Sequence, residues 1–138
     1  MRLVILESPY AGDVAKNVRY ARAAVRDSLL RGEAPMASHL LYTQEGILKD
    51  EVPEERAQGI NAGLAWGKAA QATVVYVDLG ISKGMLKGIF RAVREGRLVW
   101  VRELGPEWET KPSTSKSVLI GWDVDALGVM VPKEVPRG

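Results

Sequence analysis

Side chains able to do chemistry gather in three stretches of this 138-residue chain, at residues 7–13, 38–42 and 78–85. Each stretch combines hydroxyl groups with a carboxylate or with the one histidine of the sequence. Hydroxyls beside the N-terminus of a helix suit a phosphate or a ribose, because the free backbone N–H groups there attract anions. Carboxylates suit sugar hydroxyls or attack on an anomeric carbon. The three stretches therefore predict a polar small-molecule site if the fold brings them together.

The first stretch lies between a strand and a helix. Residues 2–6 form a short apolar run typical of a buried strand, and apolar residues recur at helical spacing from Val14 onward. Asp13 stands where a helix N-cap is expected, so its carboxylate can accept a hydrogen bond from a free backbone N–H. Ligands of open α/β sheets bind beyond the carboxyl ends of the strands, where such loops lie. The alternative is that Pro9 and Gly12 only shape a turn.

The composition excludes several kinds of site. The chain has no cysteine, which excludes disulfides, thiolate zinc sites and cysteine nucleophiles. One histidine excludes a histidine-cluster metal site, so a metal would need carboxylates alone. A net charge of +2 is too small to indicate direct nucleic-acid binding or an anionic membrane surface. A small ligand that carries a phosphate is compatible with that charge.

The length and the hydropathy pattern indicate one domain of an ordinary globular protein. The chain is 46% hydrophobic and 26% charged, which is typical of that class. No run approaches the roughly 18 apolar residues of a membrane span, and the first strand begins at residue 2 without a leader segment. We therefore expect a cytoplasmic protein that does not insert into a membrane.

The alternation of strands and helices predicts an α/β fold. Strands are expected at residues 2–6, 33–38, 73–77 and 97–101. Three helices are expected between them, and the first covers residues 14–31. The second begins at Pro53 and has the apolar positions Ala57, Ile60, Leu64 and Trp66. The third ends at Gly96 and has the apolar positions Leu86, Ile89, Phe90 and Val93. Strands that alternate with such helices form parallel sheets with right-handed crossovers. We expect a three-layer sandwich with four or five mainly parallel strands, in the order 2-1-3-4.

The last part of the chain has a different composition. Residues 105–117 are polar and broken by two prolines, which indicates a loop that could be a lid or a disordered link. Apolar runs at residues 117–121 and 128–131 could add an edge strand or a hairpin, and the residues from 132 on are expected to be loosely ordered. We treat residues 105–138 as an extension that packs on a domain of residues 1–104. Trp108 could stack on a base if its loop moves.

Three glycines lie four residues apart on one flank of the second long helix. Gly59, Gly63 and Gly67 each cost on the order of 1 kcal/mol relative to alanine in a helix interior. Close packing of another helix would compensate for this cost. That helix could belong to a second subunit, or the flank could pack against the sheet of its own chain.

The order of several short motifs resembles a known family. The motifs are Ser8-Pro9-Tyr10, Asn17, Pro35, His39-Leu40-Leu41-Tyr42, Pro53-Glu54-Glu55-Arg56 with Gly59 and Gly63, and Ser82 with Gly84-Met85. They fall in the order seen in small phage and bacterial domains that are similar to the nucleoside 2-deoxyribosyltransferases. The resemblance covers about residues 2–101.

The resemblance implies a flavodoxin-like (Rossmann-like) sheet, a homo-oligomer whose neighbouring subunits help to complete each site, and binding of a nucleoside or nucleotide. In the transferases a glutamate attacks the anomeric carbon of the sugar and the base departs, without cofactor or metal. If the gene is a phage gene, the cytoplasm is that of the host. The candidate binding residues are Ser8, Pro9, Tyr10, Asp13, His39, Tyr42, Arg56, Ser82, Gly84 and Met85.

One departure from the family pattern concerns the nucleophile. Related domains usually carry a glutamate near the start of the helix after the Gly-Met pair, where this chain has Gly88, or Lys87 if the alignment is shifted by one residue. Glu7, at a place where related sequences usually have a small residue, is the first candidate to replace it, and Asp78 at the end of the central strand is the second. The alternatives are that Glu7 is a solvated loop residue and that Asp78 forms a turn.

Three functions follow from these observations. The first is nucleoside or nucleotide binding with cleavage or transfer of an N-glycosidic bond. The second, favoured by Gly88, is binding or sequestering of a nucleotide without chemistry. The third is a structural role in a larger phage assembly.

Overall fold

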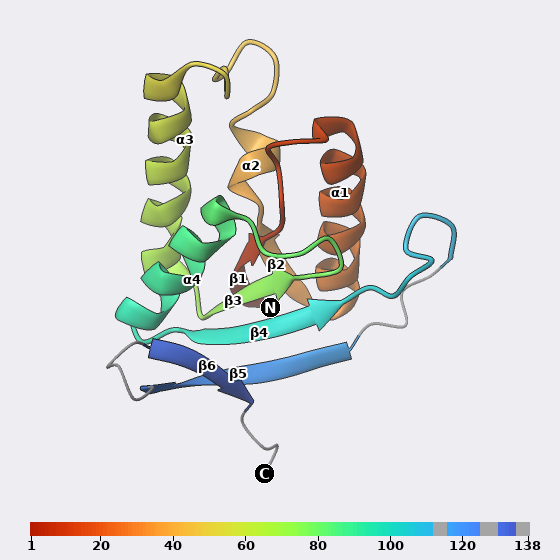
Figure 1. Ribbon diagram of the computed structural model, residues 1–138, viewed down its shortest axis with the longest axis vertical. Helices are drawn as coiled ribbons and strands as arrows, with labels where there is room; N and C mark the ends of the chain where they lie inside the picture. The colour runs from red at the N-terminus through yellow and green to blue at the C-terminus, as the bar shows by residue number, and fades with distance from the viewer. Residues whose placement is uncertain (112–115, 125–129, 135–138) are drawn as a thin grey trace.

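The computed structural model describes residues 1–111, 116–124 and 130–134. Four parallel strands form the body of one sheet: β1 (Arg2–Glu7), β2 (Glu33–Met36), β3 (Ala72–Tyr76) and β4 (Leu98–Glu103). An antiparallel hairpin of β5 (Lys116–Val124) and β6 (Met130–Glu134) continues the sheet from β4 (Figure 1). The helical segments are α1 (Val14–Leu30), α2 (Ser38–Leu41), α3 (Pro53–Trp66), the short 3₁₀ turn η1 (Gly67–Ala69) and α4 (Lys83–Arg94).

The strand order β2-β1-β3-β4-β5-β6 confirms the predicted order of the first four strands. Of the two alternatives for the last apolar runs, an edge strand or a hairpin, the structure shows the hairpin. The sheet has six strands, one more than the upper expectation, because the chain after β5 turns back and pairs with it. Residues 132–134, expected to be loosely ordered, belong to β6. Residues 135–138 lie outside the described part of the chain, so that part of the expectation is not addressed.

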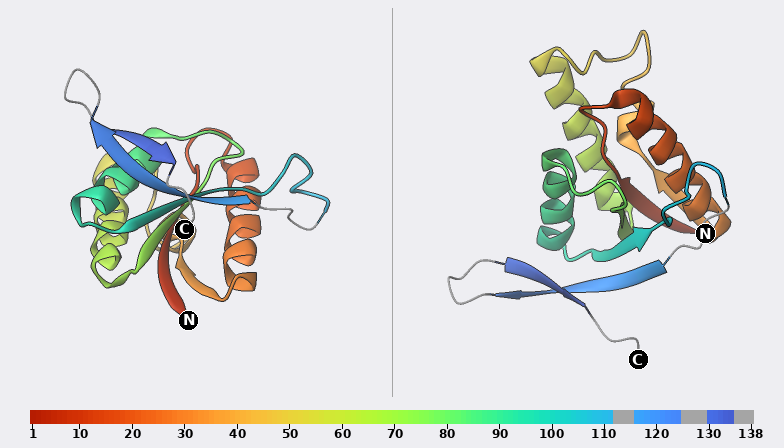
Figure 2. Two further views of the ribbon diagram at one scale, coloured as in Figure 1. Left: turned by 90° about the horizontal axis from the view of Figure 1, so that it is seen from below. Right: turned by 45° about the vertical axis from the view of Figure 1, so that its right-hand side comes forward.

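Helices cover both faces of the parallel strands, which confirms the three-layer α/β sandwich. α1 lies on one face, and α3 and α4 lie on the other, while the hairpin projects beyond the helices (Figure 2). Side chains alternate between the faces of a strand. Val4 and Leu6 pack with Tyr20 on the α1 side. Glu7, the next residue of β1, therefore faces α4.

The predicted helix boundaries agree closely with the structure. Asp13 caps α1 by accepting a hydrogen bond from the backbone N–H of Lys16 at 3.2 Å. Ser82 caps α4 through the N–H of Met85 at 3.3 Å. α3 begins at Pro53, which needs no hydrogen bond at the first helical position. Local sequence signals fix these boundaries because they act on the unpaired backbone groups of one helix end.

Two helices bury only part of the predicted apolar face. In α4, Ile89 is buried as predicted, but Leu86 and Phe90 are exposed, and Met85, Gly88 and Ala92 are the other buried residues. In α3, Ala57 and Trp66 are exposed and Gly63 is the buried residue. Small residues let both helices approach their neighbours closely, so the apolar pattern alone did not identify the buried face. Residues 38–41, which carry the histidine, form the short helix α2.

A buried ion pair lies on the α1 side of the sheet. The Arg102 guanidinium donates to both carboxylate oxygens of Glu33, at 2.6 and 2.8 Å, and Ser28 donates a further hydrogen bond to Glu33 at 2.8 Å. These hydrogen bonds and the positive charge of Arg102 outweigh the effect of burial and lower the pKa of Glu33. The pair joins β2, at one edge of the parallel strands, to β4 at the other.

Two residues of the segment 104–111, Leu104 and Trp108, pack against the core of the domain. Trp108 meets the ring of Tyr20 edge to face, with ring centroids 5.1 Å apart, and so covers α1. This contact supports a packing role for Trp108. Residues 112–115 of the predicted loop lie outside the described residues. Among the helices that the structure describes, none combines the length and apolarity needed to cross a bilayer.

Candidate functional site

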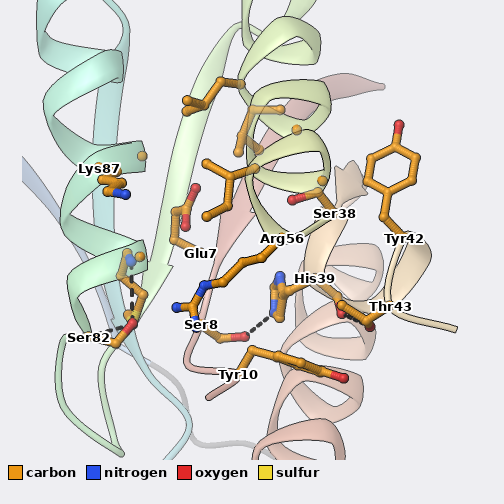
Figure 3. A pocket seen from close by; sticks show the side chains of 18 of the residues that line it. Glu7, Ser8, Tyr10, Ser38, His39, Tyr42, Thr43, Arg56, Ser82 and Lys87 are labelled. Atoms are coloured by element: carbon orange, nitrogen blue, oxygen red, sulfur yellow. Dashed lines mark hydrogen bonds between the residues drawn. The ribbon is translucent and has the colours of Figure 1, made fainter. Parts of the chain in front are cut away.

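A pocket of about 330 Å³ opens at the carboxyl end of β1, between α2, α3 and the start of α4 (Figure 3). A volume of this size falls at the lower end of the range of small-molecule sites. The pocket brings together most of the predicted site residues: Glu7, Ser8, Tyr10, His39, Tyr42, Arg56, Ser82, Gly84 and Met85. They come from β1 and its loop, α2, α3 and the start of α4, which are far apart in the sequence.

Glu7 contributes a carboxyl group to the pocket. It ends β1 and points toward α4. Burial raises its pKa to about 8, although the positive charge of Arg97 opposes this rise. Among the described residues no group donates a hydrogen bond to this carboxyl. A partly buried acid without a hydrogen-bond partner costs stability, and such groups cluster at functional sites.

Gly88 makes room for the Glu7 carboxyl. A Cβ atom added to Gly88 would overlap the Oε1 and Cδ atoms of Glu7. Gly88 is buried in the second turn of α4, and only a residue without a side chain leaves room there for the Glu7 carboxyl. The expected closeness of Glu7 and Gly88 across one pocket with Ser8, Tyr10 and Ser82 is confirmed as geometry.

Arg97 supplies a fixed positive charge at the inner wall. Its guanidinium donates to Thr73 Oγ1 at 3.0 Å, to the Gly67 carbonyl at 2.8 Å and to Glu95 at 2.5 Å. A Cβ on Gly67 would come within 2.8 Å of this guanidinium, so the glycine leaves space for it. Its side chain is 6% exposed. The sequence pattern predicts Arg97 only as the first residue of a strand. No local signal marks it as a pocket residue, because its hydrogen-bond partners come from other segments of the chain.

Ser8 and His39 form a pair inside the pocket. Ser8 Oγ and His39 Nε2 lie 2.7 Å apart, and Ser8 is buried (Figure 3). Burial lowers the pKa of His39 to about 4, so the ring is neutral at pH 7. A neutral imidazole has one acceptor nitrogen, which can take the hydroxyl proton of Ser8 in a hydrogen bond.

Three flexible cations also line the pocket. Arg56 comes from the first turn of α3, and Lys83 and Lys87 come from the first two turns of α4. Arg56 is held only loosely by Asp50, at 3.9 Å. The two lysines were not predicted as site residues, because lysines near the start of a helix are usually solvated surface residues. Together with the N-terminus of α4, these cations can attract an anionic group of a ligand.

Asp78 does not line the pocket, which corrects its grouping with Glu7 as a candidate catalytic residue. Its carboxylate accepts hydrogen bonds from the Tyr20 hydroxyl at 2.5 Å and from the backbone N–H groups of Leu104 and Gly105 at 2.8 and 3.0 Å. It therefore joins α1 to the segment after β4. A carboxylate with three donors around it is a structural linker on the opposite side of β3 from Glu7.

Two other predicted residues also lie outside the pocket lining. Asp13 caps α1, and Pro9 is buried within the loop between β1 and α1. Asn17 holds that loop by donating to the carbonyl oxygens of Tyr10 and Ala11 at 2.9 and 3.0 Å. These residues shape the loop that carries Ser8 and Tyr10.

The glycine flank of α3 packs within its own chain. A Cβ on Gly63 would overlap Ser38 of α2, and a Cβ on Gly59 would come within 3.3 Å of Leu48. The flank thus brings α3 against α2 and the loop before it, and it forms one wall of the pocket. These glycines pack internally, but against α2 and a loop rather than against the sheet as expected.

The described residues contain no group of three histidine, aspartate or glutamate side chains arranged to hold a metal ion.

The fold and the pocket define an α/β domain of Rossmann-like architecture. The chain belongs to the family described as Domain of unknown function (DUF7768), which matches residues 2–102. The matched region contains the pocket and ends one residue before the end of β4, whereas the β5–β6 hairpin lies beyond it. No curated protein matches the sequence.

Proposed function

We propose that the pocket binds a nucleoside or nucleotide and that Glu7 acts on its N-glycosidic bond. The observation that carries this proposal is the Glu7 carboxyl, which faces the pocket without a hydrogen-bond donor among the described residues and fills the space left by Gly88. The resemblance to the nucleoside 2-deoxyribosyltransferases supplies the substrate class. The hydroxyls of Tyr10 and Ser82 line the same pocket as this carboxyl and suit the hydroxyls of a sugar.

The reaction would proceed through the ionised form of Glu7. A carboxylate oxygen forms a bond to the anomeric carbon, and the C1′–N bond breaks with its electron pair moving to the base, which takes a proton from solvent. Release of the base leaves a glycosyl ester on Glu7, which water or a second base then resolves. A rigid strand end suits this role, because a nucleophile must be held about 3 to 3.5 Å from the carbon that it attacks.

The cations favour a nucleotide over a nucleoside within this proposal. Gly84, at the start of α4, and Gly88, beside Glu7, are separated by four residues, a rise of about 6 Å along the helix. That separation is comparable to the one between the anomeric carbon and the 5′ phosphate of a nucleotide. Arg56 and Lys83 would then meet the phosphate while Glu7 meets the sugar.

A second candidate function is binding of the same ligand without chemistry. The raised pKa of Glu7 favours it, because a carboxyl with a pKa of about 8 is mostly uncharged at pH 7 and then donates a hydrogen bond instead of attacking. The protein would in that case sequester the nucleotide.

Incubation with a panel of deoxynucleosides and their 5′-monophosphates, followed by chromatography for free base, separates these functions. Base release from the wild type that disappears in Glu7→Gln, with ligand affinity nearly unchanged, supports the catalytic proposal. Binding without base release supports sequestering. If the wild type neither binds nor cleaves any member of the panel, the pocket is not a nucleotide site, and a structural role in a larger assembly becomes the better proposal.

The pH dependence of base release gives an independent test of the role of Glu7. Since the ionised form attacks, the rate should rise with pH until the pH passes about 8. A rate that falls as pH rises through 8 would instead assign Glu7 the role of a proton donor.

The same proposal places the protein in the cytoplasm as a homo-oligomer whose neighbouring subunits help to complete each pocket. Because the glycine flank of α3 packs internally, a different surface would form these contacts. Sedimentation velocity of the wild-type chain measures the mass, and a monomer at the concentrations used for activity would contradict this part.

A further inference from the structure

The Ser8–His39 pair shares the pocket with Glu7. Ser8 follows Glu7 in the chain, and His39 lies in the first turn of α2, after the strand that pairs with β1. The 2.7 Å separation of Ser8 Oγ and His39 Nε2 is that of a good hydrogen bond. Among the described residues, Ser8 is the hydrogen-bond partner of the His39 ring, whereas Thr43 contacts only its backbone carbonyl.

Other groups at the pocket are poorly placed to take a proton from a ligand or a water molecule. Arg56, Lys83 and Lys87 are positively charged and can only donate. Asp50 lies near Arg56, and Glu55 accepts a hydrogen bond from the backbone N–H of Lys49 at 3.3 Å. The Ser8–His39 pair is therefore the remaining proton acceptor: it has no cationic partner, and Ser8 is adjacent to Glu7 in the chain.

The strength of His39 as a base suits one particular step. A pKa of about 4 makes the neutral ring about as basic as an ordinary carboxylate. Carboxylates of that strength activate water in glycoside hydrolases, where the attacked carbon carries much positive charge and little help is needed. His39 also stays unprotonated throughout the neutral range. It can accept a proton at the pH at which Glu7 begins to ionise.

We propose that Ser8 and His39 form a proton relay that activates the water molecule which resolves the glycosyl ester on Glu7, so that the protein is a hydrolase rather than a transferase. This inference rests on the proposed function. The water oxygen bonds to the anomeric carbon, and the bond to Glu7 breaks with its electron pair returning to the carboxylate. The water proton passes to Ser8 Oγ while the Ser8 proton passes to His39 Nε2, which later releases it to solvent. The net reaction consumes one water molecule and yields the free sugar and the base.

The relay acts on the second step alone, which makes it separable from the role of Glu7. Ser8→Ala and His39→Gln should release one equivalent of base in a first turnover close to the wild-type rate. Their steady-state turnover should then fall by about 10²-fold, the usual effect of losing a general base. Mass spectrometry of the quenched variants should find the sugar attached to the peptide that contains Glu7.

The experiment is rapid-quench kinetics with the nucleoside or nucleotide that the wild type cleaves fastest, with and without sodium azide. Azide attacks carbon without giving up a proton, so it should restore turnover in Ser8→Ala and His39→Gln but not in Glu7→Gln. Ser38→Ala is the matched control, because it removes a nearby hydroxyl that makes no hydrogen bond to His39. Thermal unfolding establishes that each variant is folded.

The outcomes distinguish the relay from the proposed function. If the wild type releases no base, the glycosidic proposal fails and the relay fails with it. If the wild type is active and both relay variants match it in steady state, the relay is overturned while the function of Glu7 stands. Equal loss of the first turnover and the steady state would also overturn it, since the pair would then serve binding. Faster product formation with an added acceptor base than with water would assign the protein to the transferases.

Discussion

Glu7 and Gly88 occupy one space: the carboxyl of the first lies where the side chain of the second would be. The two positions come from different layers, since Glu7 ends β1 and Gly88 lies in α4. A side chain at both positions would overpack the pocket. The missing glutamate at position 88 and the carboxyl at position 7 are thus one structural feature, and the following predictions begin from it.

Gly88→Ala is expected to lower the free energy of unfolding by about 1–3 kcal/mol, because the new methyl group forces the Glu7 carboxyl aside. In the Glu7→Ala background the same change should be neutral or stabilising, since alanine favours a helix by up to about 1 kcal/mol over glycine. Urea unfolding of the four proteins measures this coupling. Gly84→Ala is the control, because its Cβ would meet only Ser82 Oγ at 3.9 Å. Equal stability of Gly88→Ala and the wild type would contradict the contact.

The double variant Glu7→Gly with Gly88→Glu should return a carboxyl to the pocket from the opposite wall. If base release by Glu7 is established, this variant should release base faster than Glu7→Gly alone, whereas Gly88→Glu alone should be inactive or poorly folded. Chromatography of free base, with circular dichroism to verify folding, gives the comparison. Activity in Gly88→Glu at the wild-type level would show that the two carboxyls do not compete for space.

Glu7 should destabilise the fold at alkaline pH. Its pKa rises from 4.5 in the unfolded chain to about 8 in the folded protein, so the unfolded state loses its proton first. The stabilisation that the protonated form provides is complete below pH 4.5 and is lost as pH rises through 8. Glu7→Gln stays neutral and should therefore gain stability relative to the wild type between pH 6 and 9. Thermal melting across that range tests the sign; a difference that does not grow with pH would contradict it.

The Glu33–Arg102 pair should make the fold acid-sensitive. The pKa of Glu33 is lowered in the folded state, so its contribution is present above the ordinary pKa of a glutamate and is lost as pH falls through the lowered value. Glu33→Gln leaves the Arg102 guanidinium buried without its counter-charge and should cost about 3–5 kcal/mol at pH 7. Urea unfolding at pH 7 and pH 3 tests both statements. A Glu33→Gln variant that loses as much stability at pH 3 as at pH 7 would contradict the ionic origin.

Asp78→Asn separates a structural role from a catalytic one. The amide retains one acceptor oxygen but replaces the other with a donor that faces a backbone N–H, so we expect a loss of about 1–3 kcal/mol. Ligand binding and any base release should survive in the folded variant, because Asp78 lies outside the pocket lining. Isothermal titration with the ligand of the wild type measures this. Loss of activity without loss of stability would return Asp78 to the catalytic residues.

Much of the fold could be predicted because its signals are local. The β-branched run of β3, the proline that opens α3 and the caps of α1 and α4 each act within a few residues. The buried faces of α3 and α4 could not be predicted in this way. Their contacts use glycine and alanine, whose lack of bulk is visible in the sequence but whose neighbours are not.

Only part of the site could be predicted, because some of its residues are placed by contacts between distant segments. Loops at the carboxyl edge of a parallel sheet must meet, so Ser8, His39 and Ser82 were expected to share a pocket. Asp78 follows a strand of the same sheet, yet its side chain turns to the α1 side and binds backbone N–H groups. Arg97 was missed because its position depends on Gly67, Thr73 and Glu95, which the fold alone brings together.

The order of elements, the parallel sheet and most groups that line the pocket could be predicted from the sequence alone, because strand and helix periodicities and end signals act within short segments. The shared space of Glu7 and Gly88, the Ser8–His39 pair and the linking role of Asp78 became visible only in the folded chain. These relationships join segments more than thirty residues apart. They depend on the direction in which each side chain leaves its element, and packing across the layers of the domain sets that direction.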